Sequence, residues 1–208
     1  MSSAPKPRDA TKQATREALI AAAALEFAEQ GLEGASLNAI CARAGFTRGA
    51  FYVHFGDRED LLVAVMDRIL GGFVETLTAA SSADAAGGDL ERIITTIAFA
   101  ITASTTPLRG TAALRFHHVL GACDLAPIVR NRYVNLLNQA AEGVARAVVA
   151  GQQAGTVRAD VGAKTLAHLL IVNTLGLIAA SEVEMPIDPN AIAQMVLQMI
   201  APQSRNLA

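Results

Sequence analysis

Apolar residues recur three and four positions apart along most of the chain, a spacing typical of α-helices that bury one face. In the first such segment, about 11–30, Ile20, Ala24 and Phe27 lie along one stripe, and Gly31 follows as a residue suited to end a helix. The sequence contains no sustained alternation of apolar and polar residues and no Asn-Gly or Asp-Gly hairpin turn. The pattern therefore predicts an all-α fold.

Three residues that favour helix N-caps divide the next part of the chain. Ser36, Thr47 and Asp57 are each followed by a helical pattern, which we expect to span about 37–44, 48–55 and 58–80. After a loop at 81–88, we expect five more helices, at about 89–104, 108–122, 125–153, 161–181 and 189–201. Gly71-Gly72 interrupts the long fourth helix, as a site of close packing or as a flexible point.

The composition fits a helical protein of the cell interior. Of the 208 residues, 52% are apolar, with few aromatic residues and two cysteines, Cys41 and Cys123, too few for a disulfide framework. The first ten residues lack the apolar core of a signal peptide. The longest apolar stretch, 166–180, is 15 residues long, which is too short and too polar to cross a bilayer. We therefore expect a cytoplasmic protein.

The net charge of −2 excludes a uniformly basic surface for nucleic acid. The charge is uneven, however, because residues 1–16 hold four cations, Lys6, Arg8, Lys12 and Arg16, against Asp9 alone. A local basic cluster of this kind is enough to neutralise phosphates. The alternative is an ordinary solvated tail.

Residues 36–55 read as a helix-turn-helix, with two short helices joined by the turn at Gly45-Phe46. Ile40, Phe51 and Phe55 supply the apolar faces that hold the helices together. The outward positions of the second helix are polar, small or amphipathic, and the second helix of such a motif enters the major groove of DNA. A lone stretch of this composition is more often core packing, so the motif gains weight only from its surroundings.

Those surroundings resemble the DNA-binding domain of the TetR family over about residues 15–65. The matching residues, in order and without gaps, are Ala22-Ala23, Phe27 and Gly31, Ile40-Cys41 and Ala44-Gly45, Gly49, Tyr52 and Phe55, and Arg58-Glu59 and Leu61. Cys41, Phe51 and Arg58 depart from the usual alanine, leucine and lysine. The rest of the chain carries no family motif.

The resemblance implies an all-α protein with an N-terminal three-helix DNA-binding domain, residues 1–56, and a larger helical bundle, residues 57–208, for ligand binding and dimerisation. It implies a homodimer through helices 161–181 and 189–201, bound to double-stranded operator DNA with a pseudo-palindromic sequence. It also implies release by a small-molecule effector, and hence a ligand-responsive regulator, usually a repressor.

Carried over by position, the family's roles imply a set of DNA contacts. Asn38 and Arg48 suit base reading, because Asn pairs with adenine and Arg with guanine. Gly49 allows close approach of the backbone, and Ala50 and Val53 suit thymine methyl groups or sugars. The implied phosphate contacts are Ser36, Thr47, Tyr52, His54 and Arg58. For His54, capping or packing remains nearly as good an explanation.

Polar residues within the apolar helices are the candidates for an effector pocket: Thr95, Thr102, Thr111, His117, His118, Tyr133, Asn138 and Asn173. For each of them, an ordinary core or surface role is the stronger alternative. Scarce aromatic residues favour an aliphatic pocket and an apolar or amphipathic effector. Neighbouring histidines do not share a helix face, so His117 and His118 form a poor metal pair, and we expect no metal and no cofactor.

Two rival classes of protein remain. An enzyme is disfavoured, since the chain has no P-loop, no dinucleotide-binding glycine motif, no nucleophile elbow and no zinc-protease motif. The second rival is an all-helical module that binds small molecules or proteins and has lost DNA binding. It predicts acidic or bulky residues where this chain has Arg48, Gly49 and Tyr52.

Overall fold

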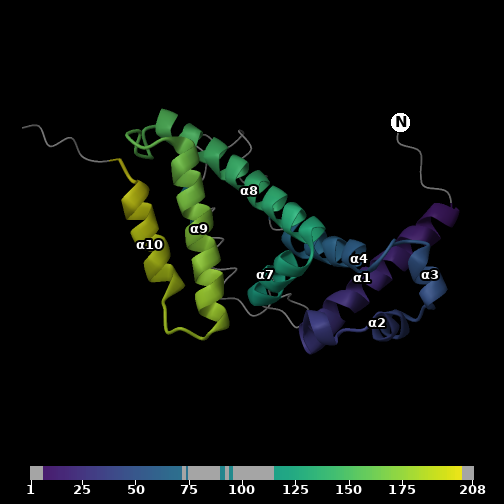
Figure 1. The fold of residues 1–208 in the computed structure, drawn as a ribbon. Coiled ribbons are helices and arrows are strands. Elements are labelled where there is room, and N and C mark those ends of the chain that lie inside the picture. The colour runs from purple at the N-terminus through teal and green to yellow at the C-terminus, as the bar shows by residue number, and fades with distance from the viewer. Residues whose placement is uncertain (1–6, 72–73, 75–89, 92–93, 96–114, 203–208) are drawn as a thin grey trace, which may run out of the picture. The chain divides into compact units, whose positions relative to one another are not determined.

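The computed structural model describes residues 7–71, 74, 90–91, 94–95 and 115–202, and the elements within these ranges are helical. They are α1 (Pro7–Gly34), α2 (Leu37–Ala44), α3 (Arg48–Tyr52), α4 (Arg58–Met66), the π-helix η1 (Asp67–Gly71), α7 (Phe116–Leu125), α8 (Pro127–Gln153), α9 (Ala163–Glu182) and α10 (Pro189–Ile200) (Figure 1). No strand occurs in the described part of the chain. The predicted all-α class is confirmed.

The chain divides into two compact units. The first comprises Met1–Ile69 and Thr111–Arg132, and the second comprises Leu70–Gly110 and Tyr133–Ala208. The first unit extends beyond position 56 because α4 and α7 both pack on α1. The predicted functional boundary between 56 and 57 stays a prediction, since compactness does not show which unit binds which ligand.

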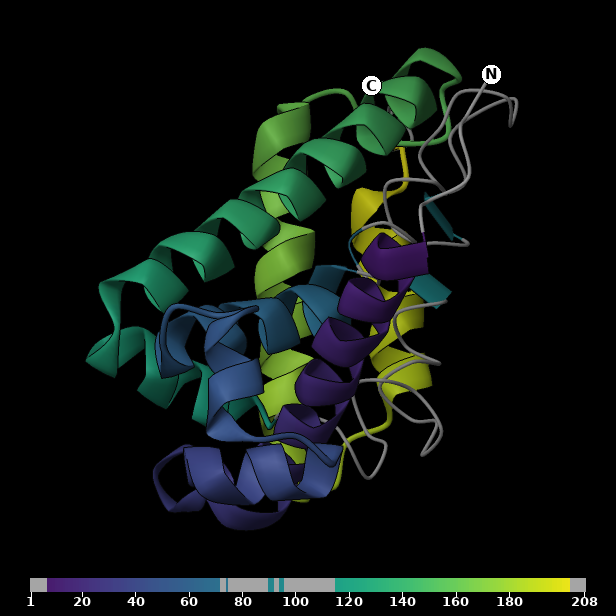
Figure 2. The same ribbon diagram turned by 90° about the vertical axis from the view of Figure 1, so that its right-hand side faces the viewer.

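Helix α1 is the centre of the first unit. It begins at Pro7 rather than at about Thr11, and a proline is tolerated there because the first turn leaves its backbone nitrogens unbonded. Gly31 has a φ of 70°, which interrupts the helical backbone where the sequence predicted an end. Leu19 and Phe27 are fully buried, and α2 and α3 lie against α1 in Figures 1 and 2.

The three predicted N-caps are confirmed. The side chain of Ser36 accepts a hydrogen bond from the Ala39 N–H at 3.1 Å, and that of Thr47 accepts from Ala50 at 3.2 Å. Asp57 accepts from the Asp60 N–H at 2.9 Å. Helix α3 ends at Tyr52 rather than near Phe55, because the N–H groups of Val53 and His54 bond three residues back.

The fourth helix changes its hydrogen-bonding pattern partway, which the sequence did not predict. Regular α-helix ends at Met66, and the π-helix η1 follows to Gly71. Of the predicted remainder, 72–73 and 75–80 lie outside the described residues. A Cβ added at Gly71 would meet nothing within 4 Å, so close packing does not explain this glycine. The flexible-point hypothesis stays a prediction.

The later helices follow the predicted order. Helix α7 ends at Leu125, three residues beyond the predicted 122, while its predicted first residues lie outside the described part. Helices α8, α9 and α10 agree with the predicted ranges within about two residues at each end. Of the predicted helix at 89–104, only 90–91 and 94–95 are described, and they are helical.

Helix α9 is longer than its apolar stretch suggested. It has 20 residues and a mean hydropathy of 1.5 over its most apolar window, so by length and composition it is able to cross a membrane. The expectation that this region is too short was wrong in that respect, because the helix extends beyond the apolar run. One such helix is weak evidence for a membrane span, since core helices of other proteins have the same composition.

Candidate nucleic-acid interface

The outer surface of α3 is the most distinctive exposed feature of the first unit. On its inner side, Phe51 is fully buried and its ring stacks on Phe55 with centroids 5.4 Å apart. On its outer side, Tyr52 is 53% exposed and Val53 is 64% exposed. Tyr52 and Val53 are neighbours and form a continuous exposed surface at this end of α3, which suits contact with another molecule.

The structure places most of the predicted DNA contacts at the surface of this motif. Ser36, Asn38, Thr47, Arg48, Gly49, Tyr52 and Val53 are exposed, and Ala50, His54 and Arg58 are half-buried. All except Arg58 lie on α2, on α3 or at their ends. Their roles in binding DNA remain predictions.

Arg48 and Tyr52 form a pair on the exposed face of α3. The Arg48 Nη2 donates a hydrogen bond to the Tyr52 hydroxyl oxygen at 3.3 Å. The two residues are four positions apart, so they lie on the same side of the helix. The pair holds the guanidinium at the surface in one orientation, with its remaining N–H groups available to an acceptor.

Arg58 is engaged inside the protein. Its Nη2 donates to the carbonyl oxygens of Leu32 and, at 3.3 Å, Ala35. Its guanidinium carbon lies 5.5 Å from the centroid of the Phe27 ring. Arg58 thus ties α4 to the connection between α1 and α2, and a contact with phosphate would compete with these bonds.

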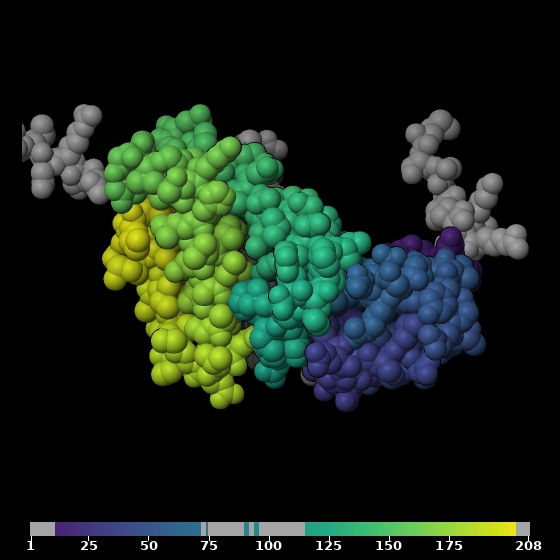
Figure 3. Space-filling model, in the orientation of Figure 1, coloured from purple at the N-terminus to yellow at the C-terminus, as the bar shows by residue number. Residues whose placement is uncertain are grey.

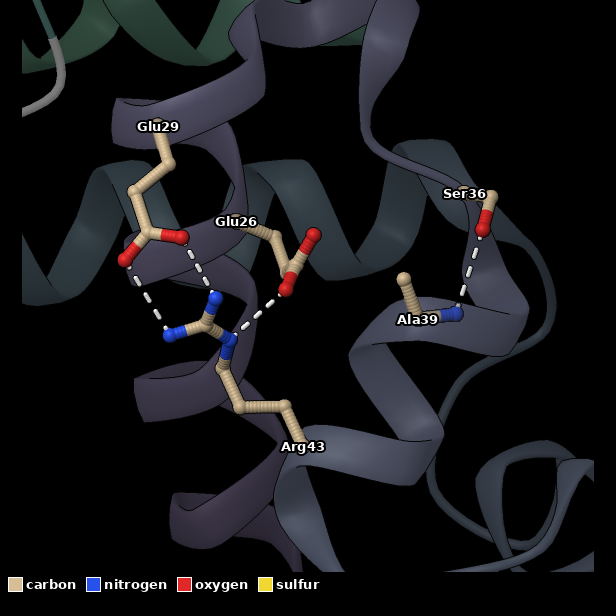
Figure 4. Close-up of polar contacts among 5 residues, drawn as sticks. All are labelled: Glu26, Glu29, Ser36, Ala39 and Arg43. Carbon is tan, nitrogen blue, oxygen red and sulfur yellow. Dashed lines mark hydrogen bonds and ion pairs between the residues drawn. The ribbon is translucent and has the colours of Figure 1, made fainter.

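An ion-pair cluster fixes α2 against α1 (Figure 4). The Arg43 Nε donates to Glu26 at 2.6 Å, and its Nη1 and Nη2 donate to the two oxygens of Glu29 at 3.2 and 2.5 Å. These hydrogen bonds, with Glu29 first, raise the pKa of Arg43. This cluster was not predicted from the sequence, although Glu26 within an apolar stripe was a signal that a buried carboxylate needs a partner.

The C-terminal end of α3 has a basic environment. Arg16 of α1 lies over the Phe55 ring, with its guanidinium carbon 5.1 Å from the centroid. His54 has an inaccessible Nδ1 with no hydrogen-bond partner in the described chain. Burial, followed by the positive charges of Lys12 and Arg16, lowers the pKa of His54. His54 is therefore neutral in the unbound protein near neutral pH.

Neither cysteine lies in a setting that activates a thiol. Cys41 is buried on α2 and Cys123 on α7. Burial raises the pKa of both thiols, and nearby Arg48 and Arg130 only partly offset this effect. Among the described residues, no three His, Cys, Asp or Glu side chains group as metal ligands.

The candidate pocket residues do not lie together on one element. Tyr133 of α8 is buried, and His118 of α7 and Asn173 of α9 are half-buried. Thr95, His117 and Asn138 are exposed, while Thr102 and Thr111 lie outside the described residues. The rings of His117 and His118 lie edge to face, with centroids 4.2 Å apart, although the two residues are neighbours in the sequence. The pocket itself stays a prediction.

Comparisons with known proteins agree with this geometry. The family model "Bacterial regulatory proteins, tetR family" matches residues 19–65. The transcriptional repressor DhaR of Mycobacterium sp. (strain GP1) is 23% identical over 93% of this chain and 96% of its own length. The repressor KstR2 of Rhodococcus jostii (strain RHA1) is 36% identical over 48% of this chain and 50% of its own length.

The similarity to solved structures extends beyond the matched segment. A structure described as the SmeT–triclosan complex superposes with a TM-score of 0.77, covering 94% of this chain and 95% of SmeT, at 25% identity. The helix-turn-helix geometry, the family model and these relatives point to one conclusion. Residues 19–65 carry the DNA-binding domain of the TetR family, and over most of its length the chain is similar to helix-turn-helix transcriptional regulators.

Proposed function

We propose that the protein is a ligand-responsive repressor that binds a pseudo-palindromic operator as a homodimer and is released by a small apolar or amphipathic effector. The observation that carries this proposal is the exposed face of α3, where Arg48 and Tyr52 are held together at the surface. Relatives that are named as repressors support repression rather than activation. Because its target is DNA, we expect the protein to act in the cytoplasm. We assign it no catalytic step.

Reading of the operator rests on Arg48 and Asn38. A guanidinium pairs with guanine through two hydrogen bonds, and the hydrogen bond that Arg48 donates to the Tyr52 hydroxyl orients Arg48 before DNA arrives. Asn38 is exposed in the first turn of α2 and suits adenine. The backbone N–H groups at the start of α3 supply contacts to phosphate, since such groups lack partners within the helix.

Dimerisation rests on the apolar surface of α9 and α10, which lie side by side in Figures 1 and 2. On α9, Leu169 is 45% exposed and Val172 is 65% exposed. On α10, Met195 and Met199 are 58% and 51% exposed. Pairing both helices with a second copy buries these groups in a four-helix interface, and two copies read half-sites roughly 34 Å apart.

The effector proposal rests on the apolar character of the second unit. Tyr133 is a buried residue on α8, and Asn173 is a half-buried residue on α9, a helix of mainly aliphatic composition. A few polar groups within an aliphatic lining suit a small apolar or amphipathic molecule. The structural similarity to SmeT in its complex with triclosan supports the same class of ligand.

The test is recovery of DNA from the source genome. The purified full chain is incubated with sheared genomic DNA, and the retained fragments are sequenced, alongside Arg48→Ala. Arg146→Ala is the matched control, because Arg146 is exposed on α8 and has no ion pair within the described residues. We expect one short pseudo-palindrome with the unchanged chain and with the control, and loss of about 1–3 kcal/mol of binding free energy with Arg48→Ala.

Two outcomes would count against parts of the proposal. Equal weakening of Arg48→Ala on all DNA sequences would show that Arg48 contacts only phosphate. Absence of enrichment with the unchanged chain, across a range of salt, would favour the all-helical binding module without DNA binding.

A further inference from the structure

The guanidinium of Arg48 is held by a neutral partner. Its Nη2 donates to the Tyr52 hydroxyl oxygen at 3.3 Å, and among the described residues no carboxylate pairs with it. Arg43 of α2, by contrast, is paired with two carboxylates at 2.6 and 2.5 Å. A carboxylate orients a guanidinium but also offsets its charge, whereas a hydroxyl orients it and leaves the charge in place. Arg48 is thus fixed in direction without being neutralised.

The phenol that holds Arg48 is itself fixed by packing. The Tyr52 ring lies edge to face on the Phe51 ring, with centroids 5.2 Å apart and ring planes at 83°. Phe51 is fully buried and stacks on Phe55. A tyrosine has only two side-chain torsions, so this contact fixes the ring with little loss of freedom. The hydroxyl oxygen therefore has a defined place on the exposed face of α3.

The Tyr52 hydroxyl has a hydrogen to donate as well as an oxygen that accepts. Because the oxygen accepts from Arg48, the O–H can donate to a second acceptor. DNA offers such acceptors in the phosphate oxygens, and the resemblance implies a phosphate contact for Tyr52. Two hydrogen bonds in series polarise each other, so a phosphate on Tyr52 would tighten the bond from Arg48.

We propose that Tyr52 is a positioning residue for base reading: its phenol, anchored on Phe51 and on a phosphate, directs the Arg48 guanidinium toward one guanine. The inference rests on the proposed function, in which Arg48 pairs with guanine. It goes further, because it makes sequence discrimination depend on a side chain that contacts no base. A phosphate contact alone gives affinity without discrimination.

A directed guanidinium discriminates better than one that rotates freely. An arginine without an intramolecular bond loses rotamer freedom only when it pairs with guanine, so the entropic cost falls on the correct sequence alone. At a wrong base pair, it is also free to turn to another acceptor. The bond between Arg48 and Tyr52 removes both effects, because the guanidinium is oriented before DNA binds.

The experiment measures the Kd of the full chain for labelled duplexes by fluorescence anisotropy. The duplexes are the pseudo-palindrome recovered above, the same duplex with 7-deazaguanine at one guanine of each half-site in turn, and a random sequence of equal length. 7-Deazaguanine lacks the N7 acceptor that arginine uses but keeps its pairing with cytosine. The guanine that Arg48 reads is the one at which this replacement no longer matters in Arg48→Ala.

The variants are Tyr52→Phe, Arg48→Ala and the two combined. Tyr52→Phe removes the hydroxyl and keeps the ring that packs on Phe51. Arg146→Ala, which changes an exposed arginine of α8, is the control. The quantity compared is the ratio of the Kd for the 7-deazaguanine duplex to the Kd for the operator. Both values come from the same protein sample, so a partly unfolded variant does not change the ratio.

We expect Tyr52→Phe to lower this ratio about two- to tenfold at the guanine that Arg48 reads, the weight of one intramolecular hydrogen bond. The combined variant should have the ratio of Arg48→Ala alone, since Tyr52 then has no guanidinium to direct. Arg146→Ala should leave the ratio unchanged. In the unbound chain, NMR relaxation should show a more ordered Nε–H for Arg48 than for Arg146.

Three results would overturn the inference and leave the proposed function intact. An unchanged ratio in Tyr52→Phe, even with weaker binding to all duplexes, would show that Tyr52 acts only on phosphate. A lower ratio in the combined variant than in Arg48→Ala would show an effect that bypasses Arg48. Equal mobility of the Arg48 and Arg146 Nε–H groups would show that the pair does not hold the guanidinium.

A different result would overturn the proposed function. If the unchanged chain binds the operator no better than the random duplex, the protein reads no sequence and the inference fails with it. The random duplex therefore separates the two failures.

Discussion

At the scale of single residues, the side chain of Arg43 holds α2 against α1 in the DNA-binding domain. Glu26 is only 7% exposed, and its carboxylate has Arg43 as its partner. A buried carboxylate without a partner is costly, because it has lost water without gaining an opposite charge. The same guanidinium also bonds Glu29, so one arginine orients α2 against one face of α1.

We predict that Arg43→Gln lowers the thermal midpoint of unfolding by several degrees, since Glu26 is left buried and unpaired. Circular dichroism or calorimetry measures the change. Arg146→Gln is the control, as it removes an exposed arginine with no ion pair in the described chain. Equal midpoints for the two variants would mean that the cluster contributes nothing to stability.

His54 should make the stability of the protein depend on pH. Its pKa is lower in the folded protein than the ordinary value of about 6.5, so the unfolded chain binds the proton more tightly. The contribution of His54 is present in full above that ordinary value and is lost as the pH falls through it toward the lower folded pKa. We expect denaturant titrations to show a steeper loss of stability below about pH 6.5 in the unchanged chain than in His54→Gln. Parallel curves would contradict this.

At the scale of elements, helix ends depend on backbone conformations that only certain residues adopt. Gly45 closes α2 with a φ of 76°, and its N–H bonds to the Ala42 carbonyl. Gly121 lies inside α7, where a Cβ would meet nothing within 4 Å. The two glycines have opposite effects, because the first is required by conformation and the second only adds freedom to the unfolded chain.

We therefore predict that Gly45→Ala lowers the free energy of unfolding by about 1 kcal/mol and that Gly121→Ala raises it by about 0.5–1 kcal/mol. Guanidinium titrations of both variants measure the difference. Each variant is the control for the other, because both add one methyl group at an accessible position of the first unit. A change of the same sign in both would contradict the argument.

The fourth helix contains a π-helix that its apolar spacing did not predict. Its apolar spacing continues past Met66, and the prediction of one long helix followed from that spacing. In the structure, Asp67 is paired with Arg132 of α8 at 2.5 Å, and Arg68 lies 3.6 Å from Glu17 of α1. Asp67 and Arg68 both belong to the π-helix, and their partners are distant in sequence, so the local pattern gave no sign of these contacts.

At the scale of the whole molecule, the exposed apolar face of α9 and α10 matters most. Val172 is 65% exposed, although α9 is among the most apolar segments of the chain. In the proposed dimer, two copies would bury this face and remove it from water, and a two-fold assembly would match a two-fold operator. Figure 3 shows the two helices packed together, with their outer surface uncovered in this view.

We predict that Val172→Glu makes the protein monomeric in size-exclusion chromatography with light scattering, and that it weakens operator binding at least tenfold, about 1.4 kcal/mol, because two half-sites no longer bind together. Val134→Glu is the control, since Val134 is 46% exposed on α8, outside the proposed interface. A dimer that persists in Val172→Glu would place the interface elsewhere.

The sequence alone determined the features that depend on neighbours along the chain. Hydrogen bonds and periodicities within a few residues determine the caps at Ser36, Thr47 and Asp57, the break at Gly31 and the motif of 36–55. The resemblance to the family was visible in the same local pattern. Only the tertiary structure decided which side chains meet across elements. Arg58 occupies a position at which the resemblance implies a phosphate contact, but its side chain donates to carbonyl oxygens 23 and 26 residues away. Arg16 lies over the ring of Phe55 because α1 packs against the helix-turn-helix, and no local pattern records such a distant contact.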